Sequence, residues 1–144
     1  MNINYIIQET PSFGKGLFAL QDILAGTQIW TYQLNHNVFE FNEQQCLAHL
    51  QGLPDLNAQQ RFLDSTFGKE DKLCLIVDDG QYMNHAEPNE CNCQTDLKTG
   101  HCYAIKDIPI GSQLFEDYTT FSHPPFLYDL LTKYNCEPTY YVLP

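Results

Sequence analysis

The sequence predicts a mostly β domain with a few short helices, and two observations carry that prediction. Short apolar or aromatic runs, each bounded by turns rich in Gly, Pro or Asp, occupy both ends of the chain, which is typical of short strands. In the middle and near the C-terminus, helix start signals are followed by apolar residues at helical spacing. A chain of 144 residues is long enough for one domain with a core, so we expect a single domain over residues 1–144.

The strands follow from their composition and from the turns between them. Two glycines make residues 11–16 a turn, and an Asp-Asp-Gly run makes 78–80 another. We expect strands at 4–8, 17–20, 28–32, 73–77, 101–105 and 114–116.

The helices follow from their caps. Asn42 is followed three residues later by Gln45, and Asn57 by Gln60, and both pairs fit an N-cap with a reciprocal Gln. They predict helices at about 43–51 and 58–66, inside a helical insertion of about 36–72. Two prolines at 124–125 open a last helix over about 124–135, since proline suits the first helical turn.

An internal similarity relates the two ends of the chain. Residues 19–29 (ALQDILAGTQI) resemble residues 104–114 (AIKDIPIGSQL) at a constant offset of 85. Each reads as strand, tight Gly-containing turn, strand. Two copies are too few for a solenoid, so we expect two similar β-units on either side of the helical insertion.

The charge restricts the partners. A formal net charge of −11, from 18 acidic and 7 basic residues, argues against direct nucleic-acid binding and suits a cationic partner, unless the acidity serves only solubility. The sequence shows neither a secretion signal nor an apolar run long enough for a membrane span. We therefore expect a soluble intracellular protein with no membrane partner, whose oligomeric state the sequence leaves open.

Six cysteines without a secretory context are expected to be reduced thiols, several of them buried. Cys91, Cys93, His101 and Cys102 could supply four metal ligands. Their spacing lacks the paired C-x2-C hooks of common zinc sites, so we expect no metal.

Three separated segments carry a family resemblance: GKGLFA at 14–19, YMNHAEPN at 82–89 and GSQLFEDY at 111–118. In order and spacing they resemble the motifs of the SET-domain family, over about residues 12–120. The resemblance looks closest to the small stand-alone SET proteins of bacteria and viruses. Each segment alone is weak, but the combination is specific.

The resemblance implies a fold, a reaction and a cofactor. The fold is the β-clip of several small sheets, with a threaded C-terminal segment. The reaction is transfer of a methyl group from S-adenosylmethionine to a lysine ε-amine. The charge suggests a basic protein, such as a histone-like tail, as the substrate.

The resemblance also assigns roles to residues. Tyr118 aligns with the family's catalytic tyrosine. The cofactor contacts fall on Gly14, Lys15, Gly16, Leu17, Tyr32, Tyr82, Asn84 and His85, although Tyr32 also fits a core aromatic. The substrate channel is expected to be lined by Glu116, Phe121, Phe126 and Tyr128, although ordinary helix packing is the favoured explanation for any single one of these aromatics.

Glu116 stands two positions before Tyr118, and on a strand the two side chains share a face. We therefore expect its carboxylate at the channel, where it would influence how many methyl groups are added.

Two departures from the family leave alternatives open. Only two residues separate His85 from Pro88, where the family has three, and the C-terminal cysteines of a zinc module are missing. One alternative is a degenerate SET module that binds cofactor or a basic tail without turnover. Another is an acidic interaction protein with a Cys/His metal site.

Overall fold

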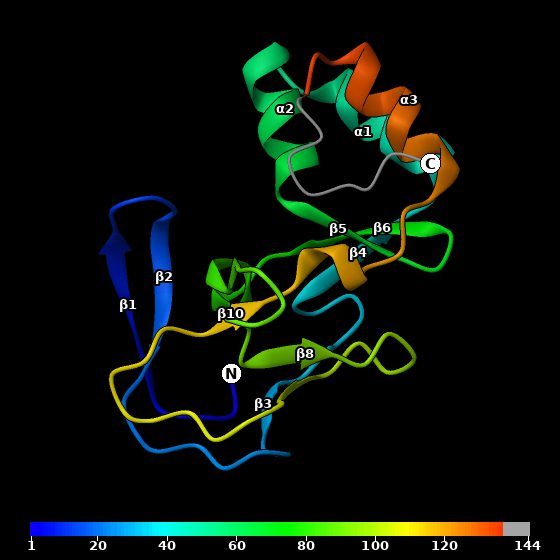
Figure 1. Cartoon of the computed structure of the whole chain (residues 1–144). Helices are drawn as coiled ribbons and strands as arrows, with labels where there is room; N and C mark the ends of the chain where they lie inside the picture. The colour runs from blue at the N-terminus through cyan, green and yellow to red at the C-terminus, as the bar shows by residue number, and fades with distance from the viewer. Residues whose placement is uncertain (137–144) are drawn as a thin grey trace. The chain divides into compact units, whose positions relative to one another are not determined.

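The computed structural model describes residues 1–136, which form three β-sheets and three short α-helices (Figure 1). This confirms the predicted mostly β class. The chain divides into two compact units: Met1–Gln33 with Val77–Tyr118, and Leu34–Ile76 with the residues from Thr119 onward. Any part of the expected threaded segment beyond residue 136 lies outside the described residues.

The first unit contains a hairpin and a five-stranded sheet. The hairpin pairs β1 (Tyr5–Thr10) with β2 (Gly14–Ala19), so residues 14–16, expected in a turn, belong to a strand. The sheet has the order β3-β9-β8-β10-β7, in which β10 runs parallel to both of its neighbours. Its strands are β3 (Gln28–Trp30), β7 (Asn84–His85), β8 (Cys93–Thr95), β9 (Cys102–Ala104) and β10 (Phe115–Glu116).

The two copies of the internal repeat pair with each other. Ile23 and Ile108, which are equivalent positions, exchange backbone hydrogen bonds of 2.9 and 2.8 Å, and both are buried. Asp22 caps the second copy and Asp107 caps the first, each carboxylate accepting one backbone N–H at 2.8 Å. The repeat therefore forms a local two-fold arrangement in which each copy completes the other.

This pairing brings the first and third motifs together. The turn glycines Gly26 and Gly111 have φ values of 83° and 85°, a left-handed conformation that glycine adopts without strain. Beyond the second turn, the backbone N–H of Leu114 donates to the carbonyl of Leu17 at 2.8 Å. Strand β2 therefore lies beside the segment that leads into β10.

The second unit combines a three-stranded antiparallel sheet with the helices. The sheet has the order β4-β6-β5, from β4 (Val38–Phe41), β6 (Lys72–Ile76) and β5 (Thr66–Lys69). The helices are α1 (Glu43–Gly52), α2 (Leu56–Asp64) and α3 (Pro125–Lys133). Strands β4 and β5 lie in the segment expected to be a helical insertion, and their pairing with β6 was not predicted.

The helix caps are partly as expected. Asn42 and Gln45 form the predicted capping box at the start of α1. The expected Asn57 cap of α2 is wrong, because Asp55 occupies that role and accepts the backbone N–H of Ala58 at 2.8 Å. Helix α2 therefore starts and ends earlier than predicted.

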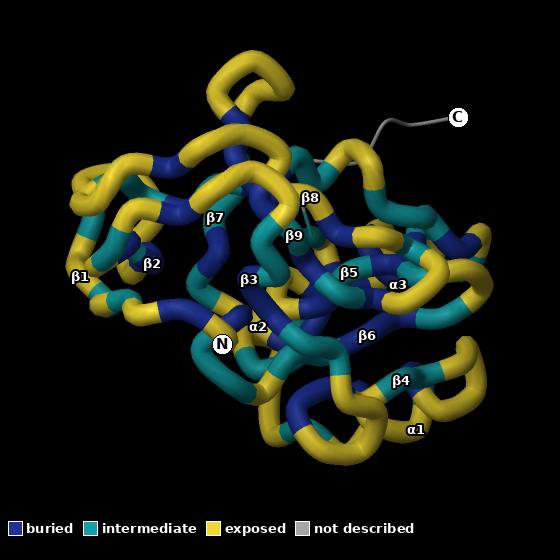
Figure 2. Tube along the Cα trace, turned by 90° about the horizontal axis from the view of Figure 1, so that it is seen from below, coloured by how far each residue is buried: buried dark blue, intermediate teal, exposed yellow. Residues whose placement is uncertain are grey.

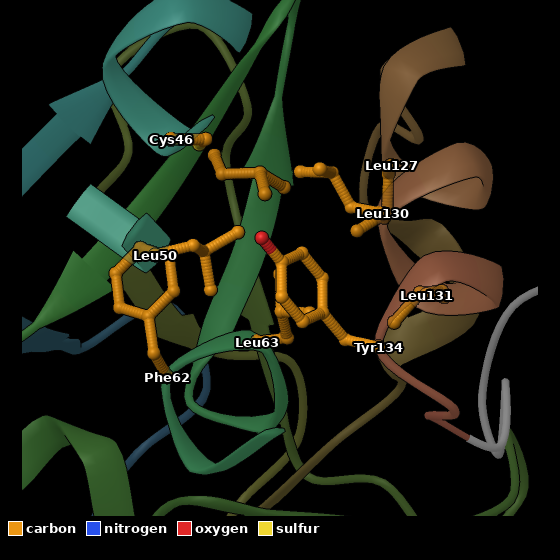
Figure 3. Close-up of a cluster of buried hydrophobic side chains, with 9 residues drawn as sticks. Cys46, Leu50, Phe62, Leu63, Leu127, Leu130, Leu131 and Tyr134 are labelled. Carbon is orange, nitrogen blue, oxygen red and sulfur yellow. The ribbon is translucent and has the colours of Figure 1, made fainter. Parts of the chain in front are cut away.

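Each unit buries apolar side chains of its own, and the buried positions appear as dark blue segments in Figure 2. In the second unit, all three helices contribute to one cluster (Figure 3). Its members are Cys46, Leu50, Phe62, Leu63, Leu73, Leu127, Leu130, Leu131 and Tyr134.

No disulfide joins any of the six cysteines, all of which lie in the described residues, and five of them are buried. The expected burial of several thiols is thus confirmed. None of the helices within residues 1–136 has the length and apolarity needed to cross a membrane.

Candidate functional site

Strand β2 and the start of β7 meet at Gly16. The Asn84 side-chain amide donates to the carbonyl of Lys15 at 2.9 Å. A Cβ at position 16 would stand 3.1 Å from Asn84 Nδ2 and 2.5 Å from Gln113 Nε2, so only glycine fits here without displacing them. The three motifs therefore converge at Gly16.

Gly14 and Leu17, the two other β2 residues assigned to the cofactor site, have different structural roles. Gly14 has a φ of 67° and opens the strand, and a Cβ there would touch nothing within 4 Å. Leu17 is fully buried, so its side chain belongs to the core and only its backbone can serve a ligand.

Lys15 and Tyr82 face each other. The Lys15 ammonium lies 5.4 Å from the centre of the Tyr82 ring, a cation–π distance. Tyr82 ends a short 3₁₀ helix, η1 (Asp79–Tyr82), which the Tyr5 hydroxyl ties to β1 by donating to Asp79 at 2.6 Å. That hydrogen bond to the Asp79 carboxylate raises the pKa of Tyr5 to about 12.

Tyr118 is held by the second motif at two points. Its backbone N–H donates to His85 Nδ1 at 3.1 Å, and its hydroxyl donates to the carbonyl of Met83 at 2.5 Å. The rings of His85 and Tyr118 are 5.4 Å apart. Because the hydroxyl hydrogen is engaged by Met83, the Tyr118 oxygen can act toward any further group only as an acceptor.

Sequence reasoning missed Gln113, although it lies in the third motif. Its side-chain nitrogen is buried and has no hydrogen-bond partner among the described residues. The nitrogen is the atom that approaches position 16 most closely. An unpartnered buried donor beside Gly16 fits a ligand that brings an acceptor, such as a carboxylate.

The expectation that Glu116 shares a strand face with Tyr118 is wrong. Strand β10 ends at Glu116, and Tyr118 begins a 3₁₀ turn, η2 (Tyr118–Thr120), so the two-residue strand period does not reach it. Glu116 is only 5% exposed, and its carboxylate accepts the backbone N–H of Thr95 on β8 at 2.5 Å.

Burial raises the pKa of Glu116 to about 7 from its ordinary 4.5. A carboxyl whose pKa is raised on folding stabilises the fold below pH 4.5, and that stability is lost as pH rises through 7. We expect the free energy of unfolding to fall by about 3 kcal/mol over this range in wild type relative to Glu116→Gln.

Urea unfolding from pH 4.5 to 8 measures this difference, and other titrating groups cancel in the comparison. Glu90→Gln, which removes an exposed carboxylate, is the control and should keep the wild-type slope. Parallel curves for wild type and Glu116→Gln would contradict the prediction.

Tyr32 packs on the β8–β9 hairpin. Its backbone N–H donates to His101 Nδ1 at 3.0 Å, and its ring lies so close to Gly100 that a Cβ there would be 2.5 Å away. The ring also meets Trp30 edge to face at 6.1 Å. These contacts give the half-buried Tyr32 a packing role, whether or not it also lines a cofactor pocket.

The other expected channel aromatics belong to the second unit. Phe121 stacks on Phe67 with ring centres 4.9 Å apart, and Tyr128 lies 6.5 Å from His123. Phe126 packs against the buried cluster of Figure 3. Their observed contacts are packing contacts within that unit.

The four candidate metal ligands do not form a metal site. Across residues 1–136, no group of three or more His, Cys, Asp or Glu side chains is arranged to hold a metal ion. Cys91 donates to the carbonyl of Ala86 at 3.1 Å, and burial raises the pKa of this thiol to about 11.

Residues 14–119 match the SET domain family, a span that contains all three motifs. The chain belongs to the SET-domain family. No curated protein matches it at a significant level.

Solved structures show the same fold. This SET domain is similar to a Plasmodium falciparum protein provisionally assigned as a histone methyltransferase, with a TM-score of 0.56 and 15% identity over 83% of this chain and 96% of that one. It is similar to ctPRC2 in an autoinhibited conformation bound to S-adenosylmethionine, with a TM-score of 0.65 and 20% identity over 94% of this chain and 17% of that one.

A third match is the Chaetomium thermophilum Polycomb Repressive Complex 2 bound to GSK126, with a TM-score of 0.63 and 18% identity over 92% of this chain and 18% of that one. This SET domain therefore spans less than a fifth of the two Polycomb chains. The cofactor predicted from the sequence, S-adenosylmethionine, is that of the SET-domain methyltransferases.

Proposed function

We propose that this SET domain is a methyltransferase that uses S-adenosylmethionine to methylate a lysine ε-amine of a basic protein. The observation that carries the proposal is the meeting of three motifs in the first unit. The side chains of Asn84 and Gln113 lie beside Gly16. Tyr118 is held in place by hydrogen bonds to His85 and Met83.

The residues present suit the cofactor. The unpartnered Gln113 nitrogen and the Lys15 ammonium are donors that a methionine carboxylate would satisfy, and Gly16 allows a close approach. Asn84 and His85 hold the second motif against β2 and Tyr118. When bound, S-adenosylmethionine supplies a methyl group on a positively charged sulfur.

Tyr118 suits the positioning of an amine. Its hydroxyl hydrogen is directed to Met83, so its oxygen can accept an N–H from the incoming lysine and orient the nitrogen lone pair. The lysine must first lose a proton, since its ordinary pKa is about 10.4. Desolvation on entering a closed, apolar site lowers that pKa and favours the neutral amine.

The substrate class rests on charge and on one relative. The chain has a formal net charge of −11, which attracts Lys- and Arg-rich segments. One structural relative is itself provisionally assigned as a histone methyltransferase. We therefore propose a basic tail, such as that of a histone, as the substrate.

Isotopic methyl transfer from labelled S-adenosylmethionine onto histones and other basic proteins tests the proposal, with mass spectrometry to locate the methylated lysines. Label on lysine residues is the expected result. Cofactor binding without any transfer would indicate a binding module instead, and the absence of both would overturn the assignment.

Asn84→Ala should weaken binding of S-adenosylhomocysteine by about ten-fold, because one hydrogen bond between the second motif and β2 is lost, together with a cofactor contact. Isothermal titration calorimetry measures the affinity. Asn89→Ala removes an exposed asparagine from the same loop and should bind like wild type. Equal affinities for all three proteins would remove Asn84 from the cofactor site.

A further inference from the structure

Buried polar side chains form hydrogen bonds between β10, with the residues just before it, and β8, with the residue just before it. At one end, the Glu116 carboxylate accepts the backbone N–H of Thr95 at 2.5 Å. At the other end, buried Asn92 accepts the backbone N–H of Phe115 at 2.9 Å and donates to the carbonyl of Gln113 at 2.8 Å. Both ends of the network therefore act on the segment that carries the third motif.

Two thiols lie between these ends. Cys102 stands opposite Thr95 in the register of β8 and β9, and Cys93 donates to the side-chain oxygen of Asn92 at 3.3 Å. Cys93 and Cys102 are each only 1% exposed, so both thiols are shielded from solvent.

Glu116 is the ionisable end of this network. The negative charge of Asp117 acts on Glu116 and disfavours its ionisation, and the charge of Glu116 in turn acts on the thiols of Cys91 and Cys102. Across the sheet, Glu116 is in register with His85 on β7 and with Cys93 on β8. Thr95 is the residue that favours its ionised form, because no cation is among the groups that shift its pKa.

An ionised carboxylate at this position is costly to the fold, because burial disfavours its charge. The charge state of Glu116 acts first on β10, the strand that ends at this residue. The backbone carbonyl of Glu116 accepts the N–H of Ala86 at 3.1 Å, while its side chain holds β8. Glu116 therefore joins three strands at the last residue before the chain turns toward Tyr118.

We propose that Glu116 is a positioning residue for Tyr118, and that its ionised carboxylate, held by Thr95, fixes the end of the strand from which Tyr118 departs. Protonation replaces a charged acceptor with a neutral carboxyl and weakens the hydrogen bond that Glu116 accepts from the backbone N–H of Thr95. The end of β10 then shifts, and with it the backbone N–H of Tyr118 that donates to His85. The proposal rests on the proposed methyl transfer only for its activity readout.

The first test needs no activity. The backbone amide resonance of Tyr118 is followed by NMR from pH 5 to 9 in wild type and in Glu116→Gln. We expect a titration step centred near 7 in wild type that is absent from the variant. His85 remains in both proteins, so a step that His85 itself causes stays in the variant. Identical Tyr118 titrations in the two proteins would overturn the proposal.

A second variant keeps the carboxylate. Thr95→Val removes the side-chain hydroxyl that lowers the pKa of Glu116, so the pKa of the carboxyl should rise further and the Tyr118 step should move to higher pH. This test remains valid if Glu116→Gln folds poorly. An unmoved step in Thr95→Val would contradict the role of Thr95.

The activity test separates positioning from substrate attraction. At pH 8, Glu116→Gln should lower kcat by about ten-fold, with the KM values for peptide and S-adenosylmethionine within about three-fold of wild type. Its kcat profile should also lack the step near pH 7. A raised peptide KM with unchanged kcat would assign Glu116 to substrate binding instead. If wild type transfers no methyl group, the proposed function fails, while the NMR result still decides the positioning role.

Discussion

Replacing Tyr118 with Phe is expected to lower the rate of methyl transfer by at least about 100-fold, while cofactor affinity stays within about three-fold of wild type. The substitution keeps the ring that packs against His85 and removes only the hydroxyl. The hydroxyl is fixed by Met83, so its oxygen is oriented before the substrate arrives. An amine that is no longer held in line with the methyl group reacts slowly even when it is bound.

Single-turnover methyl transfer and calorimetric binding of S-adenosylhomocysteine measure the two effects separately. Tyr103→Phe removes a hydroxyl from β9 and serves as the matched control, with turnover near wild type. Near-normal turnover in Tyr118→Phe would remove the role assigned to the hydroxyl. A parallel loss of cofactor affinity would show a structural role for it.

Gly68→Ala is expected to destabilise the protein by about 3 kcal/mol or more, because a side chain at this position has no room. A Cβ on Gly68 would stand 1.6 Å from the backbone carbonyl oxygen of Ser122. Backbone atoms cannot rotate away as a flexible side chain can, so β5 or the Ser122 segment must move. That movement also breaks the hydrogen bond from the Ser122 N–H to the Gly68 carbonyl, which is 3.1 Å long.

Urea unfolding of wild type, Gly68→Ala and Gly52→Ala tests this prediction. Gly52 is exposed at the end of α1 and a Cβ there would meet nothing within 4 Å, so its substitution should be neutral or slightly stabilising. Equal midpoints for Gly68→Ala and wild type would show that the contact between β5 and the Ser122 segment is not formed in solution.

The residues that meet around Gly16 could largely be named from the sequence, since they stand in three short motifs. Gly16, Asn84 and Tyr118 could be named because glycine, amide and phenol have few equivalents for close approach, hydrogen bonding and orientation. The internal repeat was visible as well, although its reciprocal pairing through Ile23 and Ile108 required the structure. Sequence similarity shows that two segments are alike, but it does not show that they bond to each other.

Glu116 shows where the sequence misled. The two-residue strand period predicted that it would face the same way as Tyr118, but β10 is only two residues long and the chain turns directly after it. The end of so short a strand is determined by its pairing with the neighbouring strands, here β7 and β8. That pairing cannot be read from the local sequence of β10.

The sequence by itself determined the family, the fold class, the capping box at Asn42 and the motif residues, because each of these depends on local geometry or on side-chain chemistry that few residue types provide. The tertiary structure alone decided the burial of Glu116, the unpartnered amide of Gln113 and the lack of space at Gly68. These three depend on atoms brought close by segments distant in sequence, and burial and steric contact are properties of that packing rather than of any residue alone.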